Sequence, residues 1–188
     1  MKPLLELHSL GQRIWLDNLS RTLLREGTLA KLIADDGVAG VTSNPSIFFK
    51  AISESPHYRD EAAALRRDPA FTPEQRYERL AVADIQAACD LLRPLYDETR
   101  GDDGYVSLEV SPALAHDATG TIAAARRLRT AVNRDNVLIK VPATPAGIIA
   151  IEALIGEGCP VNVTLMFSLA HVKRVAGEQL LGLMAEKR

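Results

Sequence analysis

The sequence predicts an α/β fold in which strands and helices alternate along the chain, and three observations support this. Short apolar runs of strand length alternate with longer segments of helical period. Most of these runs are apolar on both faces, which suits a parallel sheet covered by helices better than an antiparallel sheet with one wet face. No low-complexity linker interrupts the pattern, so we expect a single domain over residues 1–188.

The predicted strands narrow the architecture to two possibilities. Five strands cannot close an eight-stranded barrel, for which ~250 residues is typical. The chain is therefore either an open, doubly wound sheet or the N-terminal portion of a barrel. A doubly wound nucleotide-binding fold would carry a glycine-rich turn after its first strand, and no such motif occurs. We predict a fold of the (β/α)₈ TIM-barrel type, truncated to about the first five βα units. The candidate strands are 13–17, 38–42, 105–110, 137–141 and 161–166.

Helix signals fall between the strands. The sequence 72–75, T-P-E-Q, offers an N-cap, a proline at the first helical position and a capping-box glutamine. It predicts a long amphipathic helix that bends or ends near Pro94. A second Thr-Pro start at 144–145 predicts a helix that stops at Gly156 or Gly158. A further helix is expected from Ser168.

Composition and charge exclude several classes of protein. Of the 188 residues, 47% are hydrophobic and 24% charged, and the net charge is −2, so neither nucleic acid nor a membrane is an expected partner. Cys89 and Cys159 form no disulfide framework, and the four histidines have no metal-ligand spacing. We expect no metal and no cofactor. The amino-terminal residues lack the apolar core of a signal peptide, so we expect a cytoplasmic location.

Lys140 is the most informative single residue, because it lies in the apolar run 137–141, V-L-I-K-V, which predicts a buried strand. An unpaired buried ammonium is costly. Burial usually relieves that cost by lowering the pKa of the amine, and a neutral amine is the nucleophile that forms a Schiff base with a carbonyl substrate. The alternative is a lysine whose stem packs in the strand while its charged head reaches solvent.

Polar residues close the other strands as well. In a TIM barrel the carboxyl ends of the strands hold the active site. Successive side chains of a strand alternate between faces, so Thr42 and Asn44 point one way, as do Asn162 and Thr164. The candidate residues supply one amine together with carboxylates, amides and hydroxyls, and they include no cluster of metal ligands. This combination favours imine chemistry supported by general acids and bases. The candidates are Asp17, Thr42, Asn44, Glu109, Lys140, Asn162 and Thr164.

Each candidate also has a structural interpretation. Asn44 precedes a proline and is typical of a turn. Asp17 and Ser20 are possible helix caps. Thr164 has high strand propensity. Glu109 lies in a buried strand, where an unpaired carboxylate is costly, so for this residue function and structure are equally supported.

Together these segments resemble the successive strand motifs of the transaldolase family. They occur in the family's order and at similar spacing, and the start of the chain is most similar to the larger bacterial members. The matching segments are W-L-D-N-L-S-R (15–21), G-V-T-S-N-P-S-I-F (40–48), V-S-L-E-V (106–110), V-L-I-K-V-P-A-T (137–144) and V-N-V-T-L-M-F-S (161–168).

The resemblance implies a metal-free enzyme of the pentose phosphate pathway that moves a dihydroxyacetone unit from a ketose phosphate to an aldose phosphate. Lys140 would form the Schiff base. Glu109, through a water positioned with Thr164, would transfer protons, and Asp17 would take the hydroxyl proton as the carbon–carbon bond breaks. Asn44 and Asn162 would hold the dihydroxyacetone hydroxyls, and Thr42 would line the same pocket. Sugar phosphates are the expected partners. Assembly into a homo-oligomer is a further possibility.

The resemblance also places the phosphate-binding residues after a sixth strand, which this sequence does not contain. We therefore expect little or no transaldolase activity from the 188 residues alone, and an exposed apolar edge at the fifth strand. Two other hypotheses remain. One is a class I aldolase of the same superfamily, and the other is an inactive barrel fragment that needs further strands.

Overall fold

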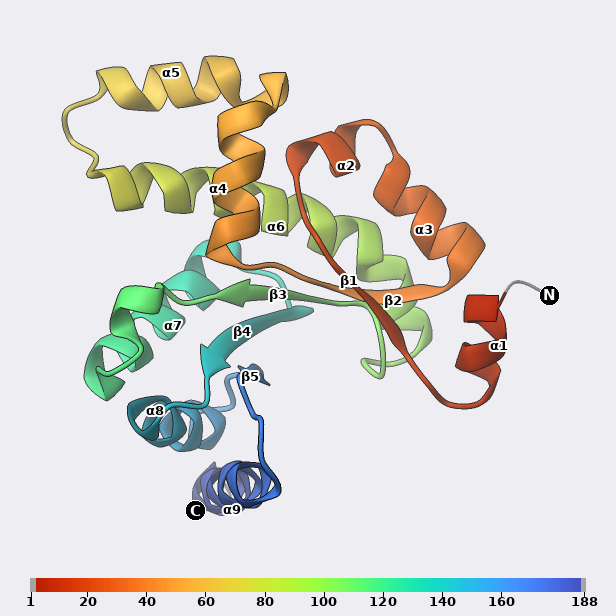
Figure 1. Ribbon diagram of the computed structural model, residues 1–188, viewed down its shortest axis with the longest axis vertical. Coiled ribbons are helices and arrows are strands. Elements are labelled where there is room, and N and C mark those ends of the chain that lie inside the picture. The colour runs from red at the N-terminus through yellow and green to blue at the C-terminus, as the bar shows by residue number, and fades with distance from the viewer. Residues whose placement is uncertain (1–2, 187–188) are drawn as a thin grey trace. The chain divides into compact units, whose positions relative to one another are not determined.

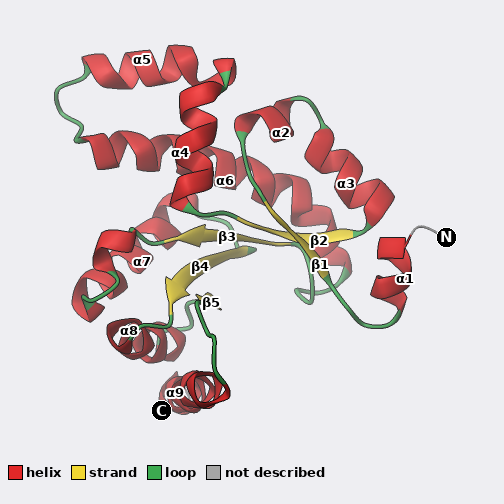
Figure 2. Ribbon diagram, viewed as in Figure 1, coloured by secondary structure: helices red, strands yellow, loops and turns green. Residues whose placement is uncertain are grey.

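The computed structural model describes residues 3–186, in which strands and helices alternate along the chain (Figure 1, Figure 2). The strands are β1 (Ile14–Asp17), β2 (Val38–Thr42), β3 (Tyr105–Glu109), β4 (Val137–Pro142) and β5 (Val161–Thr164). The α-helices are α1 (Pro3–Ser9), α2 (Arg21–Arg25), α3 (Thr28–Asp36), α4 (Pro45–Glu54), α5 (Arg59–Arg67), α6 (Pro73–Glu98), α7 (Ala118–Val132), α8 (Pro145–Gly156) and α9 (Leu169–Glu186). Two short 3₁₀ turns, η1 (Pro56–Tyr58) and η2 (Pro112–Leu114), complete the described residues.

The strands are parallel and follow the chain in the order β1-β2-β3-β4-β5. A doubly wound sheet reverses its strand order at a switch point, whereas consecutive βα units of a barrel keep the sequence order. The order therefore confirms the predicted (β/α)-barrel type with five βα units. Asp17 pairs with Thr42 between β1 and β2, and Lys140 pairs with Asn162 between β4 and β5.

The chain divides into two compact units, which are described separately. The first runs through Val106 and includes Arg134–Asn136. The second comprises Ser107–Asn133 and the chain from Val137 onward. The division falls within β3, so the first unit holds β1, β2 and the start of β3, and the second holds the end of β3 with β4 and β5.

Element boundaries match the sequence signals in most places. Thr72 and Gln75 form the predicted capping box of α6. Thr144 caps α8, which ends at Gly156, and Ser168 accepts a hydrogen bond from the His171 amide at the start of α9. Asn44 and Ser20 also act as caps, as described below.

One predicted strand end is wrong by two residues. The fifth strand ends at Thr164 rather than at residue 166, because Leu165 has φ of +66°, a left-handed backbone that cannot continue a strand. Of the two possibilities predicted near Pro94, a bend or an end, the end does not occur, because helix α6 continues to Glu98. Its last turn is held by the ion pair between Arg93 and Asp97 and by the Thr99 hydroxyl, which donates to the Leu95 carbonyl.

In the core of the first unit, β2 packs against α6, and Phe48 of α4 contacts the Tyr77 ring of α6 edge-on. Val41, Phe48 and Ile85 are fully buried there. Gly40 pairs with Trp15, and a Cβ at Gly40 would lie 2.4 Å from the Trp15 ring. Only glycine therefore lets the indole of β1 lie flat on β2 at this point.

The core of the second unit packs β4 against α7 and α8. Ile139, Val141 and Ile151 are fully buried. Helix α9 lies against α8, where a Cβ at Gly182 would come within 2.6 Å of the Glu152 carbonyl oxygen. Among the described residues, no helix has the length and hydropathy that crossing a membrane requires.

Candidate active site

Lys140 lies near the carboxyl end of β4, and its side chain is only 12% exposed. Its Nζ is 3.3 Å from Oε2 of Glu109, whose side chain is 16% exposed. The sequence predicted burial of the amine and placed Glu109 with it among the candidates at the strand ends. The positive charge of Lys140 is therefore compensated by a carboxylate on the neighbouring strand. The alternative, a lysine whose charged head reaches solvent, does not apply.

Strand pairing fixes this geometry. The Val110 amide donates to the Lys140 carbonyl at 3.1 Å, so the end of β3 runs directly beside Lys140. Glu109 closes β3, and Lys140 is followed by only two further residues of β4. The two ionisable groups therefore meet at the carboxyl ends of adjacent parallel strands, where barrel enzymes place their chemistry.

Asn162 lies on the other side of Lys140. The two residues are Cα partners in the β4–β5 register. The Asn162 side chain donates from Nδ2 to Oγ of Ser107 at 2.8 Å, and Ser107 is fully buried. The sequence analysis missed Ser107. The signal was present, because Ser107 precedes Glu109 by two positions and thus shares its face of β3.

Thr164 ends β5 as the partner of Pro142. Its carbonyl accepts from the Ala143 amide at 2.8 Å, which ties the end of β5 to the turn after β4. The His171 ring donates to the Ala143 carbonyl from the start of α9. The second unit thus brings four predicted residues to neighbouring strand ends: Glu109, Lys140, Asn162 and Thr164.

The first unit holds the other three predicted residues. Asp17 is exposed at the end of β1, beside its register partner Thr42. Asp17 also lines a groove of about 520 Å³. Its further lining residues are Asn18, Ser20, Thr22, Ile47, Lys50, Ala51, Glu54, Ser55 and Pro56.

Asn44 and Ser20 both have structural roles, although Asn44 caps a helix and was predicted as a turn residue. Oδ1 of Asn44 accepts from the Ile47 amide at 3.0 Å and caps α4. Oγ of Ser20 accepts from the Leu23 amide at 3.2 Å and caps α2. Asn44 therefore has a structural role whatever else it does, and Ser20, rather than Asp17, is the cap of α2.

A buried ionic cluster anchors the segment that follows Asp17. Nε of Arg21 lies 2.8 Å from Oδ1 of Asp84, and Arg21 also pairs with Glu61. The Tyr58 hydroxyl donates to Oδ2 of Asp84 at 2.6 Å and accepts from the Arg21 amide at 2.7 Å. Burial and the Asp84 carboxylate raise the pKa of the Tyr58 phenol. The cluster fixes the start of α2 four residues after Asp17.

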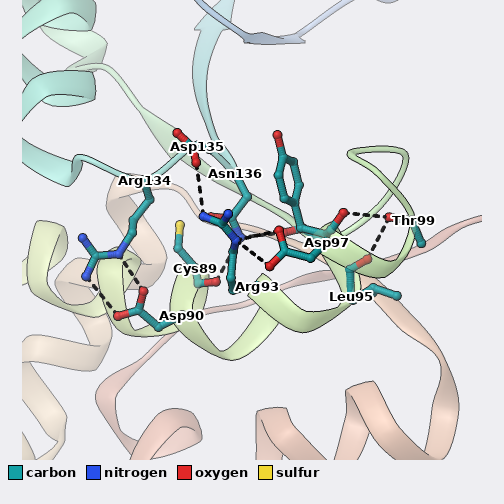
Figure 3. Close-up of polar contacts among 11 residues, drawn as sticks. Cys89, Asp90, Arg93, Leu95, Asp97, Thr99, Arg134, Asp135 and Asn136 are labelled. Atoms are coloured by element: carbon teal, nitrogen blue, oxygen red, sulfur yellow. Dashed lines mark hydrogen bonds and ion pairs between the residues drawn. The ribbon is translucent and has the colours of Figure 1, made fainter.

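A second polar cluster lies at the amino ends of β3 and β4 (Figure 3). Asn136 donates from Nδ2 to the carbonyls of Cys89, at 2.9 Å, and Gly104, at 2.8 Å. Arg134 pairs with Asp90 through two hydrogen bonds, which lower the pKa of that carboxyl, and Arg93 spans Asp97 and Asp135. In barrels this end of the strands contributes stability rather than catalysis. No group of three or more His, Cys, Asp or Glu residues suited to a metal occurs within residues 3–186.

Strand order and the Lys140–Glu109 pair together define a (β/α)-barrel protein with a lysine–carboxylate site at its strand ends. Comparison with known families agrees. The family described as Transaldolase/Fructose-6-phosphate aldolase matches residues 14–181. The chain belongs to this family.

Curated relatives carry the name transaldolase. The protein of Thiobacillus denitrificans is 56% identical over 178 residues, which is 95% of this chain and 49% of the relative. That of Neisseria gonorrhoeae is 54% identical over 171 residues, 91% of this chain and 48% of the relative. That of Trichodesmium erythraeum is 44% identical over 183 residues, 97% of this chain and 48% of the relative. The chain thus spans about half the length of these relatives.

Proposed function

We propose that this chain carries the Schiff-base site of a transaldolase, which transfers a dihydroxyacetone unit from a ketose phosphate to an aldose phosphate. The observation that carries the proposal is the 3.3 Å approach of Lys140 Nζ to Glu109 at the carboxyl ends of β4 and β3. Family membership and the names of the relatives support it. We place the reaction in the pentose phosphate pathway and in the cytoplasm.

The proposed chemistry starts with a proton transfer from the Lys140 ammonium to Glu109, for which the two groups are close enough. The free amine attacks the carbonyl carbon of the ketose, and the carbonyl oxygen takes a proton to give a carbinolamine. Loss of water leaves a protonated imine. Glu109 supplies and removes protons in these steps, through a water held with Thr164.

The carbon–carbon bond then breaks when a base takes the proton of the neighbouring hydroxyl, and the bonding electrons move into the imine. We assign this base to Asp17. Asn44 and Asn162 hold the hydroxyls of the three-carbon unit, and Thr42 lines the pocket beside Asp17. The unit stays on Lys140 until an aldose phosphate accepts it.

Borohydride trapping tests the proposal. Incubation of the chain with fructose 6-phosphate and borohydride should leave a mass increment on the peptide that contains Lys140. Lys140→Met should abolish the increment, whereas Lys31→Met, at an exposed position on α3, should not. Circular dichroism checks that both variants keep their helices. An unmodified Lys140 peptide in the unsubstituted chain would contradict the proposal.

Two alternative functions can be distinguished by measuring product release together with trapping. A class I aldolase of the same family would release product from the donor with no aldose phosphate added. An inactive fragment would neither release product nor trap. For the 188 residues alone we expect trapping with little or no turnover, because they span about half the length of the transaldolases that they match.

A further inference from the structure

Ser107 lies close to Lys140 and has no role in the chemistry proposed above. It lies in the middle of β3, between Val106 and Leu108, and its side chain is fully buried. Its Oγ accepts a hydrogen bond from Nδ2 of Asn162 at 2.8 Å, across from β3 to β5. A buried hydroxyl in an apolar strand costs stability unless it is hydrogen-bonded, so its presence needs a reason.

The hydrogen bond constrains the Asn162 side chain. An asparagine amide carries a donor and an acceptor on opposite branches, and either one can face a given partner. Because Nδ2 is directed at Ser107, the carbonyl branch, Oδ1, is directed away from it. Asn162 is also the register partner of Lys140, so the orientation of this amide is set immediately beside the nucleophile.

We propose that Ser107 is a positioning residue of the Lys140 site, whose buried hydroxyl holds the Asn162 amide in the orientation that receives the lysine-bound three-carbon unit. The inference rests on the proposed function, because it gives Asn162 its task. Ser107 and Glu109 share one face of β3. This strand therefore contributes twice to the Lys140 site: Glu109 supplies the carboxylate, and Ser107 fixes the side-chain amide of Asn162.

Removing the hydroxyl tests the inference. Ser107→Ala should slow formation of the borohydride-trapped adduct about tenfold, the equivalent of one hydrogen bond. Asn162→Ala should slow it at least as much. The double variant should be no slower than Asn162→Ala alone, because the inference assigns the effect of Ser107 on the site to its hold on this amide. Ser111→Ala, at the exposed cap of η2, is the matched control and should trap at the unsubstituted rate.

A second readout does not depend on trapping. The side-chain amide NMR signals of Asn162 should shift in Ser107→Ala and stay in place in Ser111→Ala. Unchanged Asn162 signals in Ser107→Ala would overturn the inference. So would a Ser107→Ala variant that traps at the unsubstituted rate, and in that case the role of Lys140 would stand. A chain that forms no adduct at all would overturn the proposed function first, and the inference with it.

Discussion

Glu109 is the carboxylate on which we propose that the reactivity of Lys140 depends. In Glu109→Gln the amide keeps the size of the side chain but can neither accept the ammonium proton nor compensate its charge at 3.3 Å. General acid–base groups contribute typically 10²–10⁴-fold, so we expect adduct formation to slow by at least about 10²-fold. The rate of trapping on the Lys140 peptide measures this.

The matched control for Glu109→Gln is Glu98→Gln, a change at an exposed carboxylate at the end of α6. It should leave trapping unchanged. If Glu109→Gln trapped at the unsubstituted rate, the proton would have to leave Lys140 by another route. The assignment of Glu109 as its acceptor would then be wrong, although the Schiff base itself would not.

The residues that could be foreseen from the sequence are those whose chemistry conflicts with their surroundings. Lys140 and Glu109 stand out as charges in apolar strands, and their positions at strand ends predict that they meet. Ser107 does not stand out, because a serine is compatible with any strand, and only the contact with Asn162 at 2.8 Å reveals it. Asp84 is an intermediate case. It lies on the buried face of α6 between Ala81 and Ile85, but its partners Arg21 and Tyr58 are distant in sequence.

At the scale of the elements, the helix starts were the most predictable features. A helix cap is a local interaction, so the sequence within a few residues of Thr72, Thr144 and Ser168 is enough to predict each helix start. The course of α6 through Pro94 was not predictable, because proline locally favours a bend or an end. Contacts from outside the helix hold its last turns, among them the pair between Arg93 and Asp135.

We predict opposite effects on stability for alanine substitutions at two helical glycines. Gly147 lies in the first turn of α8, where an added Cβ would come within 1.9 Å of the Pro142 carbonyl oxygen, a backbone atom. Gly177 lies in α9 with nothing within 4 Å of such a Cβ. Gly147→Ala should therefore lower the free energy of unfolding by about 1–3 kcal/mol through overpacking. Gly177→Ala should raise it by roughly 0.5–1 kcal/mol through helix propensity.

Urea unfolding followed by circular dichroism measures both variants against the unsubstituted chain. The pair is its own control, because the same chemical change is made in two helices of the second unit. An increase in the free energy of unfolding of both variants would show that helix propensity alone governs both positions. The close approach of α8 to the end of β4 would then not require glycine.

For the molecule as a whole, the sequence predicts the strand order and an exposed apolar edge at the fifth strand. Apolar side chains are exposed directly after β5, where Leu165 is 52%, Phe167 85% and Leu169 71% exposed. Nearby, Val175 is buried against Ala143 and Ile148. Within the described residues, the apolar positions of 165–175 are therefore only partly covered.

The response of the whole fold to alkaline pH follows from Cys89, a free and fully buried thiol on α6. Burial, with the Asp90 charge added, raises the pKa of this thiol from 9.0 to about 12. Below its unfolded pKa the thiol is protonated in both states, and the folded chain has its full stability. As the pH rises above that value the unfolded chain loses the proton while the folded chain keeps it, so stability falls until the folded pKa is reached.

Urea midpoints at about pH 8 and about pH 10 test this, and the contribution of Cys89 to the loss should be on the order of 1 kcal/mol. Cys89→Ala should be less stable at both pH values because of its cavity, yet it should lose less on going to the higher pH. Ile85→Val makes a small cavity in the same helix without removing a titrating group, so it should lose as much as the unsubstituted chain. An equal loss in Cys89→Ala would mean that other buried groups, such as the Tyr58 phenol, account for the whole alkaline effect.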